Sequence, residues 1–305
     1  MTGHVVVVGD ALIDELRDDA GVREFVGGAA LNVAVGLARL GLPATLIAMV
    51  GDDEAGAHVR SYLADYGVEL IGTSSEYGTA RAVSTRSGGG EPAYVFNEAS
   101  QRRRIHFGER ERRAMSDADL VAVSCFAFDD VAQADEFAGA LARSGTPLAI
   151  DPNPRTGMLH DRDAFVASFE KLAASASLVK VGEDDAAVLY GTPLDALRAR
   201  LIDLGAGAVL ATEGAAGATI ESDGVVVTRP ISTLPGRIVD TMGAGDAAFA
   251  ATLASLVDGA PTDADGWGAV LNDAMDAAAA TCRFEGALLR LPSALRDLDL
   301  DGIGT

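Results

Sequence analysis

Cysteine and histidine are scarce in this sequence, and neither forms a pattern that binds metal. The two cysteines, Cys125 and Cys282, lie far apart in apolar segments, which is typical of buried free thiols in a reducing compartment. The four histidines show no paired spacing for zinc. No Gly-x-Ser-x-Gly turn occurs either. Metal-dependent and serine hydrolysis therefore find no support.

Positive charge is also in short supply. The chain has 24 lysines and arginines against 45 aspartates and glutamates, a formal net charge of −21. Such a surface repels a polyanion unless its charges are strongly segregated. The one basic run, Arg102-Arg103-Arg104, is followed by interleaved glutamates and is interpreted as a solvated or lid surface. We expect no nucleic-acid partner.

Long hydrophobic runs are missing, because charged residues such as Arg39, Asp276 and Arg283 interrupt each candidate. The first residues carry no basic segment and lead into four valines, Val5 to Val8, which predict a strand and not a signal peptide. We therefore expect a cytoplasmic protein without a membrane partner. Hydrophobic residues make up 49% of the 305 residues, enough for a sizeable core.

Short apolar runs bounded by glycine or aspartate alternate with longer segments of helical period. This alternation predicts an α/β fold with a doubly wound, mostly parallel sheet flanked by helices. The expected strands are Val5–Val8, Thr45–Val50, Leu120–Phe126, Leu148–Asp151, Leu178–Val181 and Ala208–Thr212. The expected helices are Leu31–Leu40, Glu54–Tyr66, Val131–Arg143 and Asp163–Ala174, with two more that start at Ala244 and Trp267.

Two stretches break this rhythm. Asp14–Val26 and Thr79–Phe96 have strand character, and Gly88-Gly89-Gly90 marks the centre of an expected hairpin. We predict a small β-sheet lid, formed by about residues 14–26 and 73–107, inserted in a single domain of residues 1–305. The alternative is a surface hairpin with no role.

The run Asp240-Thr241-Met242-Gly243-Ala244-Gly245-Asp246 precedes an alanine-rich stretch that predicts a helix. Small residues let a ligand approach the backbone, and the free amide hydrogens of a first helical turn attract negative charge. A carboxylate at Asp246 would repel a phosphate unless it faces the attacking group, from which it can accept a proton. On this pattern alone, a phosphoryl-transfer site and an ordinary helix start fit equally well.

Three further segments place polar groups after strands or at a helix start. Asp10 and Asp14 would repel a pyrophosphate but can accept hydrogen bonds from sugar hydroxyls, although a capping role is the alternative. Gly27-Gly28 through Asn32 offers bare backbone and an amide to a ligand, or is an ordinary glycine turn. Arg155 ends the segment Asp151-Pro152-Asn153-Pro154-Arg155, whose prolines hold it in place to bind a phosphate or a substrate oxygen.

Lysine occurs at two positions only, Lys171 and Lys180, so the 240–246 loop lacks the lysine of a Walker-type phosphate site. Lys180 ends an expected strand and is the better candidate for a phosphate contact. The acids that follow it, Glu183-Asp184-Asp185, either act through magnesium-bound water or begin a helix in the ordinary way.

Together these segments resemble the ribokinase-like (PfkB) family of carbohydrate kinases, in order and spacing along almost the whole chain. The early glycine-asparagine signature of that family is matched by Gly27 to Ala34, and its late signature by Asp240 to Asp246. The resemblance implies a ribokinase-like fold with a β lid. It also implies transfer of the γ-phosphate of ATP to a sugar hydroxyl.

The resemblance further implies roles for particular residues. Asp246 is implied as the catalytic base, with an anion hole formed by the amides of Gly243, Ala244 and Gly245. We expect substrate contacts at Asp14, Gly27, Gly28, Asn32, Asn97 and Arg155. We expect nucleotide contacts at Lys180, Asp185, Thr212, Gly214, Gly217, Thr241, Gly243 and Gly245. ATP and Mg²⁺ are the implied cofactors, with Glu183 reaching Mg²⁺ through water and Asp240 placed where many members hold a monovalent cation such as K⁺.

Departures from the family pattern bear on the substrate. The Asn-x-x-Glu motif of the family falls on Gly182-Glu183-Asp184-Asp185, which alters the usual magnesium and phosphate support. Ala29 and Leu12 replace a lysine and an asparagine of ribokinases, which disfavours ribose. Asn97-Glu98 stands where keto-deoxy-acid kinases and many fructokinases carry Tyr-Arg, and Glu98 in place of the arginine disfavours an acid sugar. The fructokinase branch remains closest, and a neutral sugar, fructose first, is the expected substrate.

Other functions stay open at this point. A nucleoside kinase or a 2-keto-3-deoxy-sugar-acid kinase would belong to the same family. A non-catalytic sugar sensor is motivated by the altered 182–185 motif, although the intact Asp246 argues against it. Lid strands that pair across two copies of the chain would give a homodimer.

Overall fold

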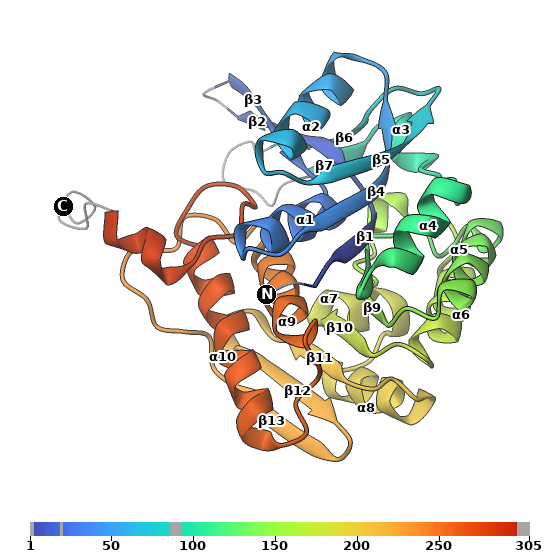
Figure 1. Ribbon diagram of the computed structural model, residues 1–305. Helices are drawn as coiled ribbons and strands as arrows, with labels where there is room; N and C mark the ends of the chain where they lie inside the picture. The colour runs from blue at the N-terminus through green and yellow to red at the C-terminus, as the bar shows by residue number, and fades with distance from the viewer. Residues whose placement is uncertain (1–2, 19–20, 86–92, 298–305) are drawn as a thin grey trace.

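The computed structural model describes residues 3–18, 21–85 and 93–297. A nine-stranded sheet forms its centre, in the order β13-β12-β11-β10-β9-β8-β1-β4-β5 (Figure 1). Neighbours from β5 through β11 run parallel, and only β12 and β13 are antiparallel. The strands are β1 Val5–Gly9, β4 Ala44–Gly51, β5 Glu69–Ser75, β8 Leu120–Ser124, β9 Leu148–Asp151, β10 Leu178–Gly182, β11 Val209–Thr212, β12 Ala218–Ser222 and β13 Val225–Arg229. The predicted doubly wound, mostly parallel sheet is confirmed.

Helices cover both faces of this sheet. One hydrophobic core joins α1, α2, α9 and α10 to one face, and a second joins α4, α5, α6 and α8 to the other. The helices are α1 Ala29–Arg39, α2 Glu54–Asp65, α3 Glu98–Gln101, α4 Glu109–Asp117, α5 Val131–Ser144, α6 Arg162–Ala173, α7 Glu183–Asp185, α8 Leu194–Leu204, α9 Ala244–Leu256 and α10 Ala264–Thr281. In the part of the chain that the structure describes, none of them has the length and apolar character to span a membrane.

Some boundaries differ from those expected. The strand predicted to reach Phe126 ends at Ser124, because Cys125 adopts a left-handed conformation with a φ of 50°. The last long helix begins at Ala264 and not at Trp267, because Asp263 caps it and accepts a hydrogen bond from the amide of Gly266 at 2.8 Å. Both differences arise from local turn chemistry that apolar periodicity does not report.

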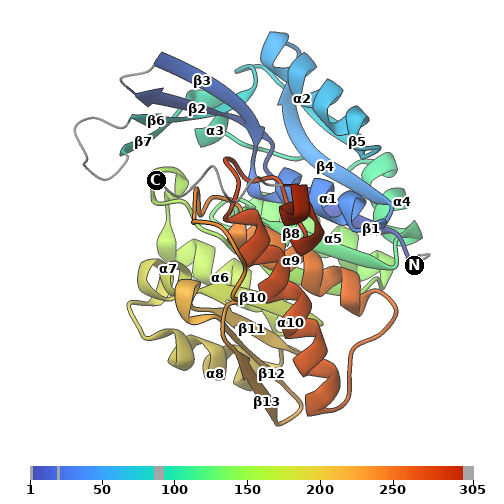
Figure 2. The ribbon, with the colours of Figure 1, turned by 90° about the vertical axis from the view of Figure 1, so that its left-hand side faces the viewer.

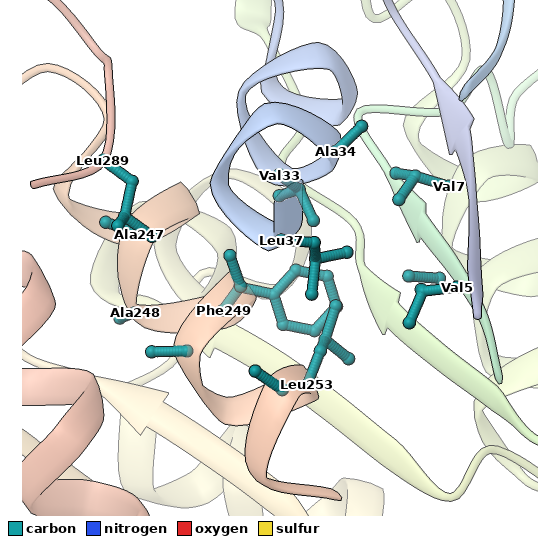
Figure 3. Close-up of a cluster of buried hydrophobic side chains, with 14 of the residues drawn as sticks. Val5, Val7, Val33, Ala34, Leu37, Ala247, Ala248, Phe249, Leu253 and Leu289 are labelled. Atoms are coloured by element: carbon teal, nitrogen blue, oxygen red, sulfur yellow. The ribbon is translucent and has the colours of Figure 1, made fainter. Parts of the chain in front are cut away.

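Helix α9 is held in place from several sides. Figure 3 shows Phe249 and Leu253 of α9 against Val33 and Leu37 of α1, with Val7 of β1 beyond them. All five side chains are fully buried, and each contributes about 1.5–3 kcal/mol relative to an exposed position. Because α10 also packs on α9, nearly every side of α9 is apolar. The position of the N-terminus of α9 is therefore fixed by the core.

A second, four-stranded sheet stands beside the body of the protein (Figure 2), in the order β3-β2-β6-β7. Its strands are β2 Leu12–Asp18, β3 Gly21–Gly27, β6 Ala80–Thr85 and β7 Ala93–Phe96. We call it the small sheet. Residues 73–75, within the range predicted for the lid, belong instead to β5 of the large sheet, and the predicted hairpin centre at 88–90 lies outside the described residues.

The topology brings several loops to one edge. From β1 the chain proceeds outward to β4 and β5, and it later returns to β8 on the opposite side of β1. Ligands of open α/β sheets bind beyond the carboxyl ends of strands at such a switch point. Here that point lies between the ends of β1 and β8, and β2 of the small sheet leaves β1 directly after Asp10 and Ala11.

Candidate active site

The two signature segments of the sequence meet at this edge. Asp246 lies in the first turn of α9 and is 8% exposed. Asn32 in α1 donates a hydrogen bond from Nδ2 to Oδ2 of Asp246 at 2.8 Å. One carboxylate oxygen of Asp246 is thereby held in place. The other oxygen makes no hydrogen bond to a described residue, so it can accept a hydrogen bond, and then the proton, from a hydroxyl.

The pKa of Asp246 is raised from 3.8 to about 6, chiefly by burial and also by the negative charge of Asp151. The hydrogen bond from Asn32 and the positive charges of Arg155 and Lys180 act in the opposite direction. A carboxylate with a pKa near 6 is ionised at neutral pH yet accepts a proton more readily than an ordinary aspartate.

The turn before α9 presents open backbone amides. Gly243 has a φ of 75°, and a Cβ there would lie 2.6 Å from the backbone of Ala287, so only glycine fits. The amide of Ala244 donates back to the carbonyl of Thr241 at 3.3 Å. Among the described residues, nothing accepts the amide hydrogens of Gly243 and Gly245. Of the three amides predicted for an anion hole, these two are available.

A buried ion pair lies beside that turn. Lys180, at β10, donates from Nζ to Oδ1 of Asp151 at 3.1 Å, and Ser124 donates to Oδ2 of the same carboxylate at 3.0 Å. Asp151 is fully buried. Burial alone would lower the pKa of Lys180, but the charges of Asp151, Asp185 and Asp246 raise it. The lysine is therefore charged. A Cβ added at Gly245 would lie only 3.2 Å from Nζ, which places the ammonium beside the open amides.

The end of β1 and the start of α1 form the opposite wall. Oδ1 of Asp10 accepts a hydrogen bond from the amide of Ala30 at 3.0 Å. A Cβ at Gly27 would lie 2.1 Å from Oδ2 of Asp14, and one at Gly28 would lie 2.8 Å from the carbonyl oxygen of Asp10. The two glycines thus let both acids lie against the backbone.

These acids share a crowded electrostatic environment. Burial raises the pKa of Asp10, and burial together with the charges of Asp10 and Asp246 raises that of Asp14 to about 7. The positive charge of Arg155 lowers both pKa values. The side chain of Arg155 is exposed and makes no hydrogen bond to a described residue. It can therefore turn toward a ligand placed among these three carboxylates.

The segments predicted to contact a nucleotide lie farther along the same edge. Thr212 ends β11 and donates a hydrogen bond to the carbonyl of Val181 at 3.3 Å. Gly214 and Gly217 have φ values of 53° and 109° in the link to β12, and a Cβ at Gly217 would clash with the carbonyl oxygen of Arg229. Thr241 is exposed in the turn before α9. The edge from β10 to β12 therefore presents bare backbone and one hydroxyl.

Asn97 occupies a different environment. Its Oδ1 accepts hydrogen bonds from the amides of Ser100 and Arg81, each at 3.0 Å, and its Nδ2 donates to the carbonyl of Thr79 at 2.9 Å. The side chain caps α3 and ties it to β6. These partners favour a structural role for Asn97 over the sugar contact that the sequence suggested.

The acids after β10 divide into buried and exposed members. Asp185 is buried, and its Oδ2 accepts a hydrogen bond from the amide of Gly182 at 2.6 Å, which closes the turn of α7. Burial raises its pKa to about 6, an effect that Lys180 opposes. Glu183 is exposed at the edge of the sheet. Asp184 is exposed as well, so Glu183 and Asp184 are the acids free to act on a bound group through water.

Asp240 ties the turn before α9 to the loop after α10. Its two carboxylate oxygens accept hydrogen bonds from the amides of Met242 and Gly286, at 3.1 and 3.2 Å. Within the residues that the structure describes, no group of three or more His, Cys, Asp and Glu side chains is arranged to hold a metal ion. A cation here would need backbone carbonyls or a ligand as further partners.

Asp151 and Ser124 were not assigned a role from the sequence. A signal for the first was present: an acid at the end of a fully apolar strand must find a partner, and one of the two lysines lies in the next strand. Ser124 carries no such signal, because a serine at a strand end is common.

A family model described as pfkB family carbohydrate kinase matches residues 2–289. The chain belongs to the pfkB family of carbohydrate kinases. A fructokinase from Klebsiella pneumoniae is 29% identical to this pfkB-family chain over 304 residues, which cover 96% of this chain and 97% of that one. The predicted family and the predicted class of enzyme, a carbohydrate kinase, are confirmed.

Solved structures of other kinases share the fold. An aminoimidazole riboside kinase from Salmonella enterica, complexed with aminoimidazole riboside and an ATP analogue, has a TM-score of 0.78 at 24% identity and covers 96% of this chain and 98% of its own. A double mutant of fructokinase from Vibrio cholerae O395, in a form with fructose, ADP and potassium ion bound, has a TM-score of 0.77 at 21% identity and covers 94% of both chains.

Proposed function

We propose that this sugar kinase transfers the γ-phosphate of ATP to a hydroxyl of a neutral sugar, with fructose as the first candidate. The observation that carries the proposal is Asp246, buried beside two open amides and oriented by Asn32. The fructokinase from Klebsiella pneumoniae, similar along nearly the whole chain, supports fructose as the first sugar to test.

In this proposal the sugar lies against Asp14, Gly27, Gly28 and Asn32, and Arg155 contacts one of its oxygens. The reacting hydroxyl points at Asp246. Its oxygen forms a bond to the γ-phosphorus while the bond between that phosphorus and the bridging oxygen of ADP breaks. Asp246 takes the hydroxyl proton, and the electron pair of the broken bond leaves on ADP.

Negative charge on the phosphoryl oxygens is stabilised by the amides of Gly243 and Gly245 and by the ammonium of Lys180. A single donor of this kind contributes about 10²–10³ in rate. The remaining phosphates and the ribose extend along Thr212, Gly214 and Gly217. Asp185 supports the nucleotide side of the site indirectly, because its carboxylate accepts the amide hydrogen of Gly182 and so closes the turn after β10.

Mg²⁺ fits this site as a partner of the nucleotide and not as a resident ion. Such ions are commonly held by substrate phosphates, water and one or two carboxylates, and Glu183 is exposed at the right edge of the sheet. When bound, Mg²⁺ would offset phosphate charge. For K⁺ we propose the loop of Asp240, on the strength of the potassium-bound fructokinase of the same fold; equal activity in K⁺, Na⁺ and Tris would dismiss this site.

We further propose that the small sheet, with its strands β2, β3, β6 and β7, acts as the lid of a single domain. Its strands begin at the sugar side of the site, so closure over the sugar would exclude the water that competes for phosphate. Pairing of lid strands between two copies would make a homodimer, which size-exclusion chromatography with light scattering tests directly. We place the enzyme in the cytoplasm.

The decisive experiment replaces Asp246 by Asn, which keeps the shape of the side chain and removes the base. We expect the fold and sugar binding to persist and turnover to fall by about 10²–10⁴, followed as ADP release. Asp265→Asn, an exposed acid in the first turn of α10, is the matched control and should leave turnover unchanged. Turnover near that of the wild type in Asp246→Asn would overturn the mechanism.

A nucleoside acceptor is the second candidate, supported by the fold shared with the aminoimidazole riboside kinase. A thermal-shift panel of neutral sugars, nucleosides and 2-keto-3-deoxy acids, each with and without ATP and followed by ADP release, separates these substrates. A sugar that stabilises the protein but never yields ADP would favour a sensor instead.

A further inference from the structure

A small cavity lies where the end of β1, the residues after β8 and the segment after α3 meet. Helix α3 packs on β6 and β7 of the small sheet (Figure 2), so this segment connects the small sheet to the body. The cavity has a volume of about 20 Å³, which is room for one water molecule or one hydroxyl group. Its lining is mostly apolar and includes four side chains with nitrogen or oxygen atoms, namely Asp10, Ser100, Arg103 and Gln133.

Two of these four side chains already bond to the protein. The hydroxyl of Ser100 both accepts a hydrogen bond from the backbone of β6 and donates one to it. Oε1 of Gln133 accepts the amide hydrogen of Ile105 at 2.6 Å, and its Nε2 donates to the carbonyl of Arg103 at 3.5 Å. Asp10 and Arg103 are therefore the side chains that can serve a ligand in this cavity.

Arg103 differs from its two neighbours in the basic run. Arg102 forms an ion pair with Glu98 at 3.0 Å, and Arg104 forms one with Asp130 at 2.9 Å. Arg103 is half-buried and has no carboxylate partner among the described residues. Its Nη1 donates to two backbone carbonyls at 3.3 and 3.4 Å, its Nε is buried without a partner, and its Nη2 makes no hydrogen bond to a described residue. Nη2 is thus the nitrogen that can bind a ligand.

Asp10 borders both this cavity and the proposed sugar site. Its Oδ1 accepts the amide hydrogen of Ala30 at the start of α1, and its backbone carbonyl lies against Gly28. Among the described residues, the thiol of Cys125 is the donor left for its other oxygen, and a thiol donates only weakly. Asp10 therefore retains a carboxylate oxygen for a ligand.

The charges on the two sides of the cavity select what can occupy it. Burial raises the pKa of Asp10, and the positive charges of Arg155 and Arg103 oppose this increase. Arg103 and Asp10 nevertheless form no ion pair with each other, although both line the cavity. An anion between them would be repelled by the carboxylate, and a cation by the guanidinium. A neutral hydroxyl suits both groups, because it donates one hydrogen bond and accepts another.

We propose that Arg103 is a specificity-determining residue of the acceptor site, which together with Asp10 brackets one hydroxyl of the sugar. The proposal rests on the sugar-kinase function argued above. The hydroxyl donates to the free carboxylate oxygen of Asp10 and accepts a hydrogen bond from Nη2 of Arg103. Because Asp246 does not line the cavity, this hydroxyl is not the one that receives the phosphate. A sugar that lacks it leaves two charged groups without their partner, so the site discriminates against that sugar.

The test compares fructose with its 1-, 3-, 4- and 6-deoxy derivatives, each of which lacks one hydroxyl. For one derivative that can still be phosphorylated, we expect kcat/KM to be about 10- to 100-fold below that of fructose, the effect of hydrogen bonds to charged groups. Arg103→Met should reduce this ratio at least about 5-fold and leave the ratios for the other derivatives as in the wild type. Asp10→Asn is a second, independent variant and should reduce the ratio for the same derivative. Arg102→Met, at the exposed neighbour, is the matched control and keeps every ratio.

The outcomes separate this proposal from the proposed function. If Arg103→Met changes the ratios for all derivatives alike, or for none, the cavity holds water and not a sugar hydroxyl, and the proposal is overturned while the kinase stands. If no sugar yields ADP, the kinase proposal fails, and the same ratios are then taken from Kd values measured by calorimetry. A panel in which no sugar binds overturns both proposals. Should another parent sugar prove to be the substrate, the deoxy series is made on that sugar.

Discussion

Removing the ammonium of Lys180 should destabilise the protein more than any other single change of a lysine. In Lys180→Met, Asp151 keeps only the hydrogen bond from Ser124, although it is fully buried. Leaving one member of a buried ion pair without its partner costs about 3–5 kcal/mol. With an unfolding entropy of about 2.1 cal/mol/K per residue, the 305 residues give ~0.64 kcal/mol/K, so Tm should fall by about 5–8 °C.

The chain offers a matched control, since Lys171 is its other lysine. Lys171 forms an ion pair with Asp135 at 2.7 Å, but both side chains are more than half exposed. Exposed pairs of this kind contribute about 0–1 kcal/mol. Urea unfolding followed by far-UV circular dichroism should therefore give Lys171→Met a free energy of unfolding close to that of the wild type. The value for Lys180→Met should be about 3–5 kcal/mol lower.

A double variant separates stability from catalysis. Asp151→Asn combined with Lys180→Met removes both charges, so most of the lost stability should return. Turnover should not return, because the phosphate still lacks the ammonium beside Gly245. The reasoning about the buried pair would be refuted if Lys180→Met lowered the free energy of unfolding by less than about 1 kcal/mol. It would also be refuted if the double variant were no more stable than Lys180→Met.

Three further predictions concern protons and backbone. The kcat/KM for the sugar should fall below about pH 6, because Asp246, with a pKa raised to about 6, must be ionised to accept a proton; a flat profile down to pH 5 would contradict this. Asp14 binds its proton more tightly when folded, with a pKa raised from 3.8 to about 7, so it stabilises the fold below pH 3.8 and this contribution is lost as the pH rises through 7. In urea unfolding, the free energy of unfolding of Asp14→Asn minus that of the wild type should therefore be larger at pH 8 than at pH 5. The same difference at both pH values would exclude the effect. Gly243→Ala should lower the free energy of unfolding by about 1–3 kcal/mol and lower kcat, because its Cβ meets the backbone of Ala287. Gly41 also has a positive φ but has open space around it, so Gly41→Ala should keep kcat.

The large sheet was accessible from the sequence because its strands are buried on both faces. The run Val5–Val8 and its counterparts are almost wholly apolar, which distinguishes parallel strands from the alternating pattern of an exposed sheet. The edge strands β5 and β13, and β12 next to β13, were not predicted. Each has exposed or half-exposed positions, so its apolar pattern is broken.

The meeting of Asn32 with Asp246 does not follow from strand order alone, because α1 follows β3 of the small sheet and α9 follows the antiparallel strand β13. The family resemblance implied roles for both residues at one site. The small sheet is harder to derive. Its central strands β2 and β6 pair in parallel across more than 60 residues of chain, and no local pattern in either strand specifies that register.

The charge balance of the site explains why an acid can stand within an anion-binding turn. Asp151 is matched by Lys180, and the amide of Gly182 holds Asp185, so neither carboxylate is free to face the phosphate. Asp246 is the acid that remains, and its raised pKa reflects an environment that disfavours its charge. Accepting a proton from the attacking hydroxyl relieves that unfavourable charge at the moment when the phosphoryl group arrives. The repulsion that makes the sequence Gly243-Ala244-Gly245-Asp246 unusual is thus part of the driving force for proton transfer.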